Sequence, residues 1–271
     1  PQLPQLSIQP SVALGPDGEI ALSWCGSEET DLGIWFSLLS PDGTILTGPY
    51  ALETNSTGIQ NEPDICALPG GGYVVVWSMD AQEANADGQN LYIRYRRIGS
   101  NGEPLDESDR EVRTPNPGNH WLTEVACDPG GGFMVVGTMA EANMTFGVFA
   151  QRFDLEGEPI GEPITLNSDP EGSQVFPSVD IGPGGTAQVA WVDQTGFGTE
   201  NELHQIVLLQ LDAMEQTPSA DPIVLTSPGQ FADRPDVSID PETGAVLVSA
   251  VLDQQFTGLY KVGPDGTQVQ R

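Results

Sequence analysis

Residues 63–77 read PDICALPGGGYVVVW, and this stretch decides the fold. Apolar residues recur at every second position, at Ile65 and Ala67 and again at Val74 and Val76, and three glycines separate the two runs. Alternation with a period of two around a glycine turn is typical of an antiparallel β-hairpin. We therefore predict two strands here, joined at residues 69–72.

The same pattern occurs five times along the 271 residues. The copies begin at Pro10, Pro63, Thr123, Pro177 and Pro235, and the position fourteen residues later holds Trp24, Trp77, Gly137, Trp191 and Ser249. A period of 53 to 60 residues leaves room for about four strands in each copy. The third strands are expected at 34–39, 91–98, 147–153, 205–211 and 258–262. The repeat predicts an all-β protein, a five-bladed β-propeller of four-stranded blades, as a single domain over residues 1–271.

The two ends of the chain suggest how the ring closes. The last copy ends soon after its Asp265-Gly266 turn, which leaves little chain for a fourth strand. Residues 3–8, from Leu3 to Ile8, precede the first copy and could lie beside Tyr260. We therefore predict that the N-terminal strand completes the last blade and removes the exposed sheet edges.

The composition is strongly acidic, with 39 acidic and 9 basic residues and a formal net charge of −30. Such a charge repels phosphate backbones and anionic bilayers, so we expect no nucleic-acid partner. No apolar run is long enough to span a bilayer, so we expect no direct membrane insertion. The three cysteines are interpreted as small buried side chains rather than as a disulfide.

A ring of polar side chains is expected around the axis, because the first strand of each propeller blade lines the central channel. The residues that follow the five repeat starts are Ser11, Asp64, Glu124, Ser178 and Asp236. The carboxylates of Asp64, Glu124 and Asp236 are our candidate metal ligands, and Ca²⁺ is the cation that fits oxygen ligands. A solvated ring and a catalytic pair of carboxylates remain as alternatives, although the repeat argues against the unequal surroundings that a catalytic pair needs.

The hairpin at 63–77, together with strands such as Phe149-Ala150-Gln151-Arg152-Phe153-Asp154, resembles the repeats of secreted bacterial β-propeller proteins. The resemblance covers nearly the whole chain. It implies an exported surface, matrix or adhesion protein, and five-bladed propellers of this kind also include lectins and some glycosidases. No position matches a catalytic motif, so the resemblance supplies no active-site residue.

These observations lead to one functional expectation and two alternatives. We expect a non-catalytic binding or scaffold module, located outside the cell, on its surface or in the periplasm, whose rim loops contact a protein or assembly partner. The first alternative is a lectin that binds glycans with aromatic side chains. Trp24, Trp77 and Trp191 are more readily explained as packing residues between blades. The second alternative is a glycoside hydrolase that uses Asp64, Glu124 or Asp236.

Overall fold

The computed structural model describes residues 4, 6–27, 32–54, 58–80, 91–116, 118–141, 145–167, 172–195, 203–212, 218, 221–227, 229–263 and 268–270. These residues form five four-stranded antiparallel sheets, and they contain no helix. Within this part of the chain no helix is long and apolar enough to cross a membrane. Each sheet is built from four consecutive strands, which is the order expected for a propeller blade.

The strand bounds follow the repeat. Blade 1 contains β1 (Leu6–Leu14), β2 (Ile20–Ser27), β3 (Leu32–Leu39) and β4 (Ile45–Ala51); blade 2 contains β5 (Ile59–Ala67), β6 (Tyr73–Asp80), β7 (Leu91–Ile98) and β8 (Arg110–Glu111); blade 3 contains β9 (His120–Cys127), β10 (Phe133–Ala140), β11 (Phe146–Phe153) and β12 (Pro159–Thr165); blade 4 contains β13 (Ser173–Ile181), β14 (Ala187–Thr195), β15 (Leu203–Leu211) and β16 (Ile223–Val224); blade 5 contains β17 (Ala232–Ile239), β18 (Val246–Leu252), β19 (Phe256–Val262) and β20 (Gln268–Gln270).

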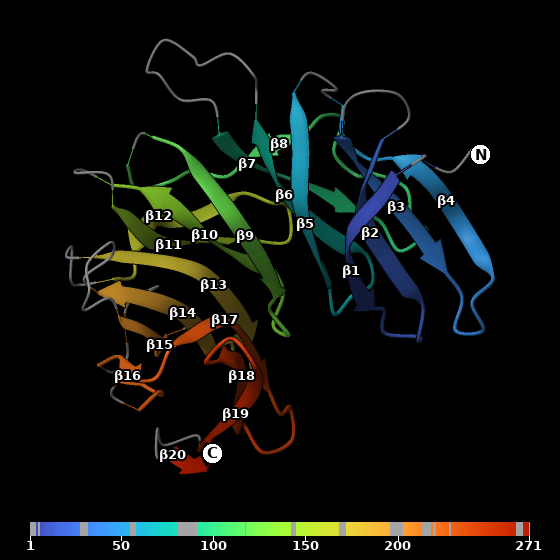
Figure 1. Cartoon of the computed structure of the whole chain (residues 1–271). Coiled ribbons are helices and arrows are strands. Elements are labelled where there is room, and N and C mark those ends of the chain that lie inside the picture. Colours follow the sequence, from blue (N-terminus) through green and yellow to red (C-terminus); the bar gives the residue numbers. More distant parts are fainter. Residues whose placement is uncertain are drawn as a thin grey trace.

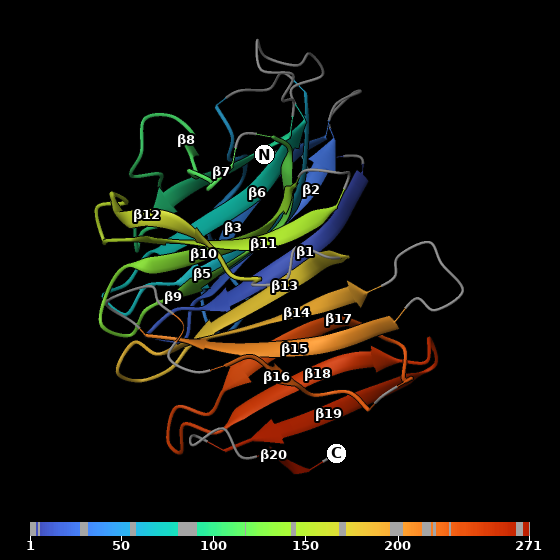
Figure 2. The same cartoon turned by 90° about the vertical axis from the view of Figure 1, so that its left-hand side faces the viewer.

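The predicted fold class is confirmed. The sheets follow one another around an axis, with β1, β5, β9, β13 and β17 on the inside (Figure 1), and a view from the side shows them stacked as successive blades (Figure 2). All five predicted third strands fall within β3, β7, β11, β15 and β19. The five-bladed β-propeller is therefore the architecture that the repeat predicts.

Four apolar cores join neighbouring blades in sequence order: blade 1 with 2, 2 with 3, 3 with 4, and 4 with 5. Two of the tryptophans expected between blades are buried there, Trp77 at 0% and Trp191 at 2% exposure. Trp24 is only half-buried, because its side of blade 1 faces no neighbour. No apolar core of the described residues joins blade 5 to blade 1, and the two blades stand at the ends of an arc in Figure 1.

Blades 2 and 3 are held together by more than their apolar core. A disulfide connects Cys66 on β5 to Cys127 on β9, so the expectation of unpaired buried cysteines is wrong for this pair. The two positions lie on opposite faces of their own blades, and those faces meet where the blades pack. Cys25 remains a free, buried thiol, whose burial raises its pKa to about 12.

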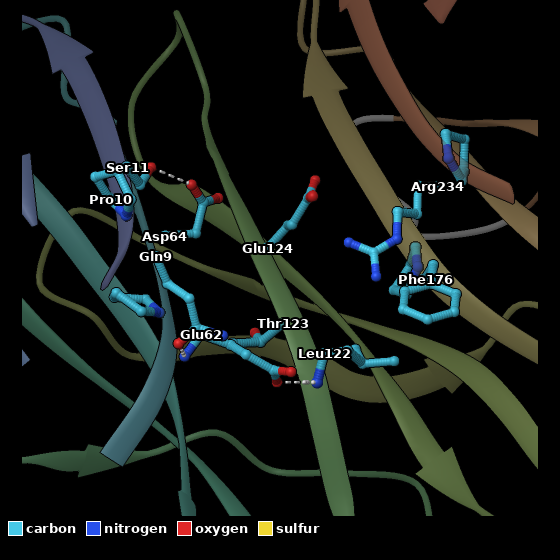
Figure 3. Close-up of a pocket in the computed structure, with 13 residues that line it drawn as sticks. Gln9, Pro10, Ser11, Glu62, Asp64, Leu122, Thr123, Glu124, Phe176 and Arg234 are labelled. Atoms are coloured by element: carbon cyan, nitrogen blue, oxygen red, sulfur yellow. Dashed lines mark hydrogen bonds between the residues drawn. The ribbon is translucent and has the colours of Figure 1, made fainter. Parts of the chain in front are cut away.

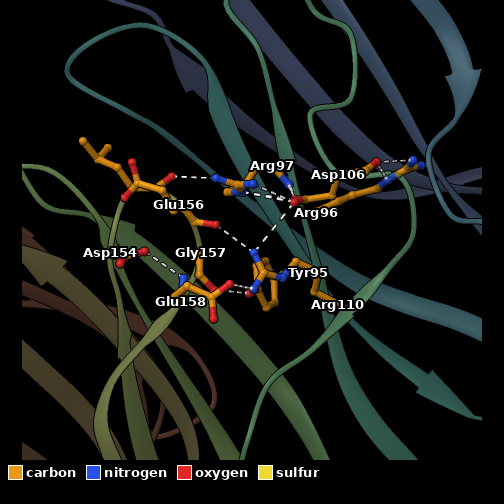
Figure 4. Close-up of polar contacts among 10 residues, drawn as sticks. Tyr95, Arg96, Arg97, Asp106, Arg110, Asp154, Glu156, Gly157 and Glu158 are labelled. Atoms are coloured by element: carbon orange, nitrogen blue, oxygen red, sulfur yellow. Dashed lines mark hydrogen bonds and ion pairs between the residues drawn. The ribbon is translucent and has the colours of Figure 1, made fainter.

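Polar contacts also cross from blade 2 to blade 3 (Figure 4). The Tyr95 hydroxyl donates to the Gly157 carbonyl at 2.7 Å, and the Arg97 guanidinium donates to the Leu155 carbonyl at 2.8 Å. Asp106 accepts from Arg97 at 2.8 Å and neutralises its charge. These bonds use the turn between β11 and β12, so they fix the outer part of blade 3 against blade 2.

The predicted closure by the N-terminal strand is wrong. Residues 6–8 are the first part of β1, where they pair with residues 25–27 of β2 in the same blade. Blade 5 supplies its own fourth strand, β20, which pairs with β19. The sequence argument treated the repeat start as the beginning of the inner strand, whereas β5 begins four residues before Pro63. Leu3 and the Asp265-Gly266 turn lie outside the described residues.

The fifth copy also differs in register from the prediction. Ser11, Asp64, Glu124 and Ser178 face residues twelve positions later on the second strand, but Asp236 faces Ser249, thirteen positions later. The hairpin over 240–245 is therefore one residue longer than its counterparts. As a result Ala250, and not Ser249, occupies the tryptophan position, and it is buried against blade 4.

Candidate functional site

Each inner strand contains a β-bulge just before the repeat start. The bulges place five non-glycine residues in the left-handed region: Gln9 (φ 51°), Glu62 (φ 52°), Leu122 (φ 51°), Phe176 (φ 54°) and Arg234 (φ 49°). This conformation is unfavourable for residues with a Cβ, and such strain collects at functional sites. Bulges also redirect side chains. Because the same strained conformation occurs at one position of all five repeats, these residues form a defined surface around the axis.

These bulges surround a pocket of about 560 Å³ at one mouth of the central channel (Figure 3). Its lining comes from the inner strands of all five blades: Gln9, Pro10, Ser11, Glu62, Pro63, Asp64, Leu122, Thr123, Glu124, Phe176, Pro177, Arg234 and Pro235. The sequence analysis found Ser11, Asp64 and Glu124 but missed the bulge residues. The sequence marks the bulge residues only by their position, because each one directly precedes a repeat start.

Asp64 lies on β5 and is held by neighbours on both sides. The Ser11 hydroxyl donates to its Oδ1 at 2.7 Å, and the Val125 N–H donates to its Oδ2 at 2.9 Å. Burial is the largest influence on this carboxyl and raises its pKa, while the two donors act in the opposite direction. Asp64 is thus fixed in orientation between blades 1 and 3.

Glu124 lies on β9, and its side chain points into the pocket (Figure 3). Burial raises its pKa to about 8, and the negative charge of Asp64 adds to this rise. Hydrogen bonds from the Ser178 hydroxyl and the Val179 N–H lower the pKa but do not cancel the effect of burial. The shift favours the protonated form of Glu124, whose side chain faces the pocket.

Asp236 lies on β17, at the end of the arc, and is exposed. Partial desolvation by the surrounding strands raises its pKa, and a hydrogen bond with the Ser178 side chain, which Glu124 shares, opposes this shift. Its effect on the other carboxyls shows that they share one channel, because its charge raises the pKa of both Asp64 and Glu124. The repeat thus places three carboxyls around one axis in unequal surroundings, contrary to the equivalence assumed from the sequence.

The cation site expected at Asp64, Glu124 and Asp236 stays a prediction. The described residues include no group of three or more His, Cys, Asp or Glu side chains gathered closely enough to hold a metal ion. Calcium binding at this ring is tested by the melting temperature with and without the ion.

The mouth also carries a cation and an aromatic ring. The Arg234 guanidinium stacks over the Phe176 ring, with 5.6 Å from its central carbon to the ring centroid. Figure 3 shows this pair on the opposite side of the pocket from Ser11 and Asp64. An aromatic face and a planar donor beside carboxyls are groups that contact sugar rings and their hydroxyls.

Comparisons with known proteins identify the fold. No protein-family model matches the chain, and no curated protein matches it in sequence. Solved structures do match. An α-L-arabinanase from Penicillium chrysogenum, complexed with arabinobiose, has a TM-score of 0.65 at 16% identity, over 98% of this chain and 81% of its own. A GH43 endo-arabinanase from Bacillus licheniformis has a TM-score of 0.54 at 13% identity, over 98% of both chains.

A third similar structure is the polysaccharide lyase Uly1, with a TM-score of 0.58 at 10% identity, over 96% of this chain and 58% of its own. At these identities the likeness establishes the propeller fold. It also overturns the expectation of a non-catalytic scaffold or adhesion module with a protein partner, because the matching propellers are carbohydrate-cleaving enzymes. The lectin and adhesion label receives no support from these structures.

Proposed function

We propose that this protein is a glycoside hydrolase that cleaves a polysaccharide at the mouth of its central channel. The observation that carries the proposal is a pocket lined by Glu124, Asp64 and Glu62, in which burial raises the pKa of Glu124. Glycosidases need one carboxylic acid that keeps its proton and one carboxylate that acts on the opposite side of the bond. The likeness to arabinanase structures supports the same reaction class.

Glu124 is the general acid in this proposal. It protonates the glycosidic oxygen as the bond from this oxygen to the anomeric carbon breaks. Its pKa of about 8 keeps it protonated through neutral pH, and it becomes a better proton donor as the leaving oxygen gains negative charge.

Asp236 is the general base. It directly follows Pro235, which lines the pocket, and it is the most exposed of the three carboxyls, so a water molecule can reach it from the channel. Asp236 removes a proton from that water while the water oxygen bonds to the anomeric carbon. The products are two shorter sugars, and both carboxyls then return to their starting states by exchanging protons with solvent. This single displacement inverts the anomeric configuration.

Asp64 is a positioning residue. Its carboxylate is fixed by Ser11 and by the Val125 N–H, so it cannot turn toward a substrate without losing both bonds. Its negative charge raises the pKa of Glu124. Asp64 therefore helps Glu124 to hold its proton, while Phe176 and Arg234 supply the surface on which a sugar ring rests.

We also infer that the protein works outside the cytoplasm. The disulfide between Cys66 and Cys127 requires an oxidising compartment to persist. A polysaccharide substrate is encountered in the same environment. The high negative charge keeps the protein soluble there.

The experiment measures release of reducing sugar from a panel of plant and microbial polysaccharides, with arabinan first because of the similar structures. We expect turnover by the wild-type protein and a loss of about 10²–10⁴-fold in kcat for Glu124→Gln. Asp236→Asn should lose a similar factor. A matched control is Glu242→Gln, which changes an exposed glutamate on the turn over 240–245, far from the pocket lining.

The pH profile separates the two roles. Glu124 predicts an alkaline limb near pH 8 in kcat/KM. Asp64→Asn should move that limb to lower pH, because the charge that raises the pKa of Glu124 is removed. Turnover that survives unchanged in Glu124→Gln, or no turnover of any polysaccharide by the folded wild type, would overturn the proposed function.

A further inference from the structure

The pocket at the channel mouth has two chemically different halves. In one half the bulge side chains bind the backbone of the next blade: Gln9 Oε1 accepts the Glu62 N–H at 3.2 Å, and Glu62 Oε2 accepts the Leu122 N–H at 3.2 Å. This series ends at blade 3, because the next two bulge residues, Leu122 and Phe176, have no polar side-chain atom. The bulge positions of the other half therefore supply two apolar side chains and the guanidinium of Arg234.

Arg234 is exposed and lines the pocket across from Asp64 (Figure 3). Glu62 and Glu124 line the same pocket, yet Arg234 forms no ion pair with any carboxyl of the described residues. Four arginines of blades 2 and 3 do pair with carboxylates: Arg94, Arg97, Arg110 and Arg152. In a chain with 39 acidic and 9 basic residues, a guanidinium that pairs with none of the described carboxylates is available for an external anion.

Phe176 orients this guanidinium for binding. The central carbon of the Arg234 guanidinium lies over the Phe176 ring, 5.6 Å from its centroid. The ring contacts the flat face of the guanidinium and leaves the N–H groups in its plane free to donate. Two parallel N–H groups match two oxygens of a carboxylate or sulfate. The pair is therefore a preformed site for an oxyanion, next to apolar surface.

We propose that the substrate is an acidic polysaccharide, in which a sugar bound in the pocket carries an oxyanion, a uronate carboxylate or a sulfate ester, that Arg234 holds through two parallel hydrogen bonds while Leu122 and Phe176 contact the apolar part of the same sugar. This inference rests on the proposed function and names its substrate class. The net charge of −30 slows the approach of such a polymer, but salt screens this repulsion beyond about 8 Å. Inside the pocket, burial favours the uncharged form of Glu124, which limits repulsion of the bound anion.

The experiment compares kcat/KM within matched pairs of polysaccharides. Polygalacturonate, alginate and glucuronoxylan are each compared with their carboxyl-reduced forms, and a sulfated galactan is compared with its desulfated form. We expect the wild-type protein to prefer the charged member of at least one pair by about 10- to 100-fold, because hydrogen bonds between charged groups are the strong ones. Arg234→Gln should abolish this preference by raising KM for the charged member. The matched control is Arg113→Gln, which removes the same charge from an exposed arginine outside the pocket lining and should keep the preference.

The pairs also identify the anion. A preference in a carboxyl pair assigns a uronate, and a preference in the galactan pair assigns a sulfate ester. Equal values within every pair, or a preference that survives in Arg234→Gln, would overturn the inference. Turnover of neutral polysaccharides that Glu124→Gln abolishes would then leave the proposed function intact.

A binding measurement tests the inference without turnover. Calorimetry follows oligosaccharides cut from the same charged polymers as they bind to Glu124→Gln, and to the same variant with Arg234→Gln added. We expect binding that weakens by about 10- to 100-fold in the double variant. If both variants bind every charged oligosaccharide equally, or neither variant binds any, the inference is wrong whatever the catalytic activity of the wild type.

Discussion

The interface between blades 2 and 3 and the outer faces of blades 5 and 1 use the same repeat positions but differ in what covers them. The first buries an aromatic core with Tyr95, Phe133 and Phe153 and adds a disulfide. The second presents its apolar side chains to solvent. The difference extends to the channel, where Asp64 and Glu124 border the packed interface and Asp236 lies exposed on the last blade. Packing between blades therefore gives the repeated carboxyls different surroundings.

The largest expected effect on stability comes from the tryptophans that occupy the same repeat position at a packed interface and on the outer face of blade 1. Trp77→Ala removes a fully buried ring and its bond to Gln60, and should lower the free energy of unfolding by about 3–5 kcal/mol. Trp24→Ala should cost less, about 1–3 kcal/mol, because its ring is half-buried. Urea unfolding measures both. A cost below about 1 kcal/mol for Trp24→Ala would show that its ring stays at the surface.

The disulfide tests how much the packed interface depends on its covalent link. Replacing both partners, Cys66→Ala with Cys127→Ala, should lower stability by about 2–4 kcal/mol, because the bond closes a loop with a sequence separation of 61. Thermal unfolding with and without a reductant provides the control. Reductant should lower the melting temperature of the wild type but leave the double variant unchanged, and equal responses would contradict this account.

The channel carboxyls predict how stability depends on pH. Burial raises the pKa of Glu124 from 4.5 to about 8, so the folded protein holds a proton that the unfolded chain releases over this range. The corresponding stability is complete below pH 4.5 and is lost as pH rises toward 8. Glu124→Gln should flatten this decline relative to the wild type in urea unfolding. Parallel curves for the two proteins would exclude Glu124 as the titrating group.

The smallest effect concerns the hydroxyls that cross packed interfaces. Tyr95→Phe removes the bond to the Gly157 carbonyl and should cost about 1–2 kcal/mol. Tyr50→Phe removes the related bond to Gly102 between blades 1 and 2, at 2.8 Å, and should cost a similar amount. Unfolding by urea compares the two. A stability equal to that of the wild type in both variants would mean that water replaces these bonds without loss.

Much of the fold is predictable from the sequence because the repeat is expressed in local patterns. The hairpin at 63–77 predicts β5 and β6, and the spacing of the repeat starts predicts five blades and the ring that includes Asp64 and Glu124. The sequence analysis missed the first part of each inner strand, because the bulge at residues such as Glu62 interrupts the alternation. It also assigned Ser249 to the position that Trp77 occupies in blade 2. One added residue in the turn over 240–245 changes the register, so Ala250 lies there instead.

The chemistry of the site was less predictable for a physical reason. The pKa of Glu124 depends on Ser178, Val179 and Asp64, which lie more than fifty residues away in the chain. The disulfide likewise depends on two faces that only meet once blades 2 and 3 pack. A repeat shows which positions are equivalent, but it does not show how their neighbours differ.

The central claim is that burial in the channel raises the proton affinity of Glu124, one of the three repeated carboxyls. The most direct test is an NMR titration of the side-chain carboxyl carbons, with the Glu124 signal assigned by its absence in Glu124→Gln. The account predicts a midpoint near pH 8 for Glu124. A midpoint near the ordinary value of 4.5 would contradict it.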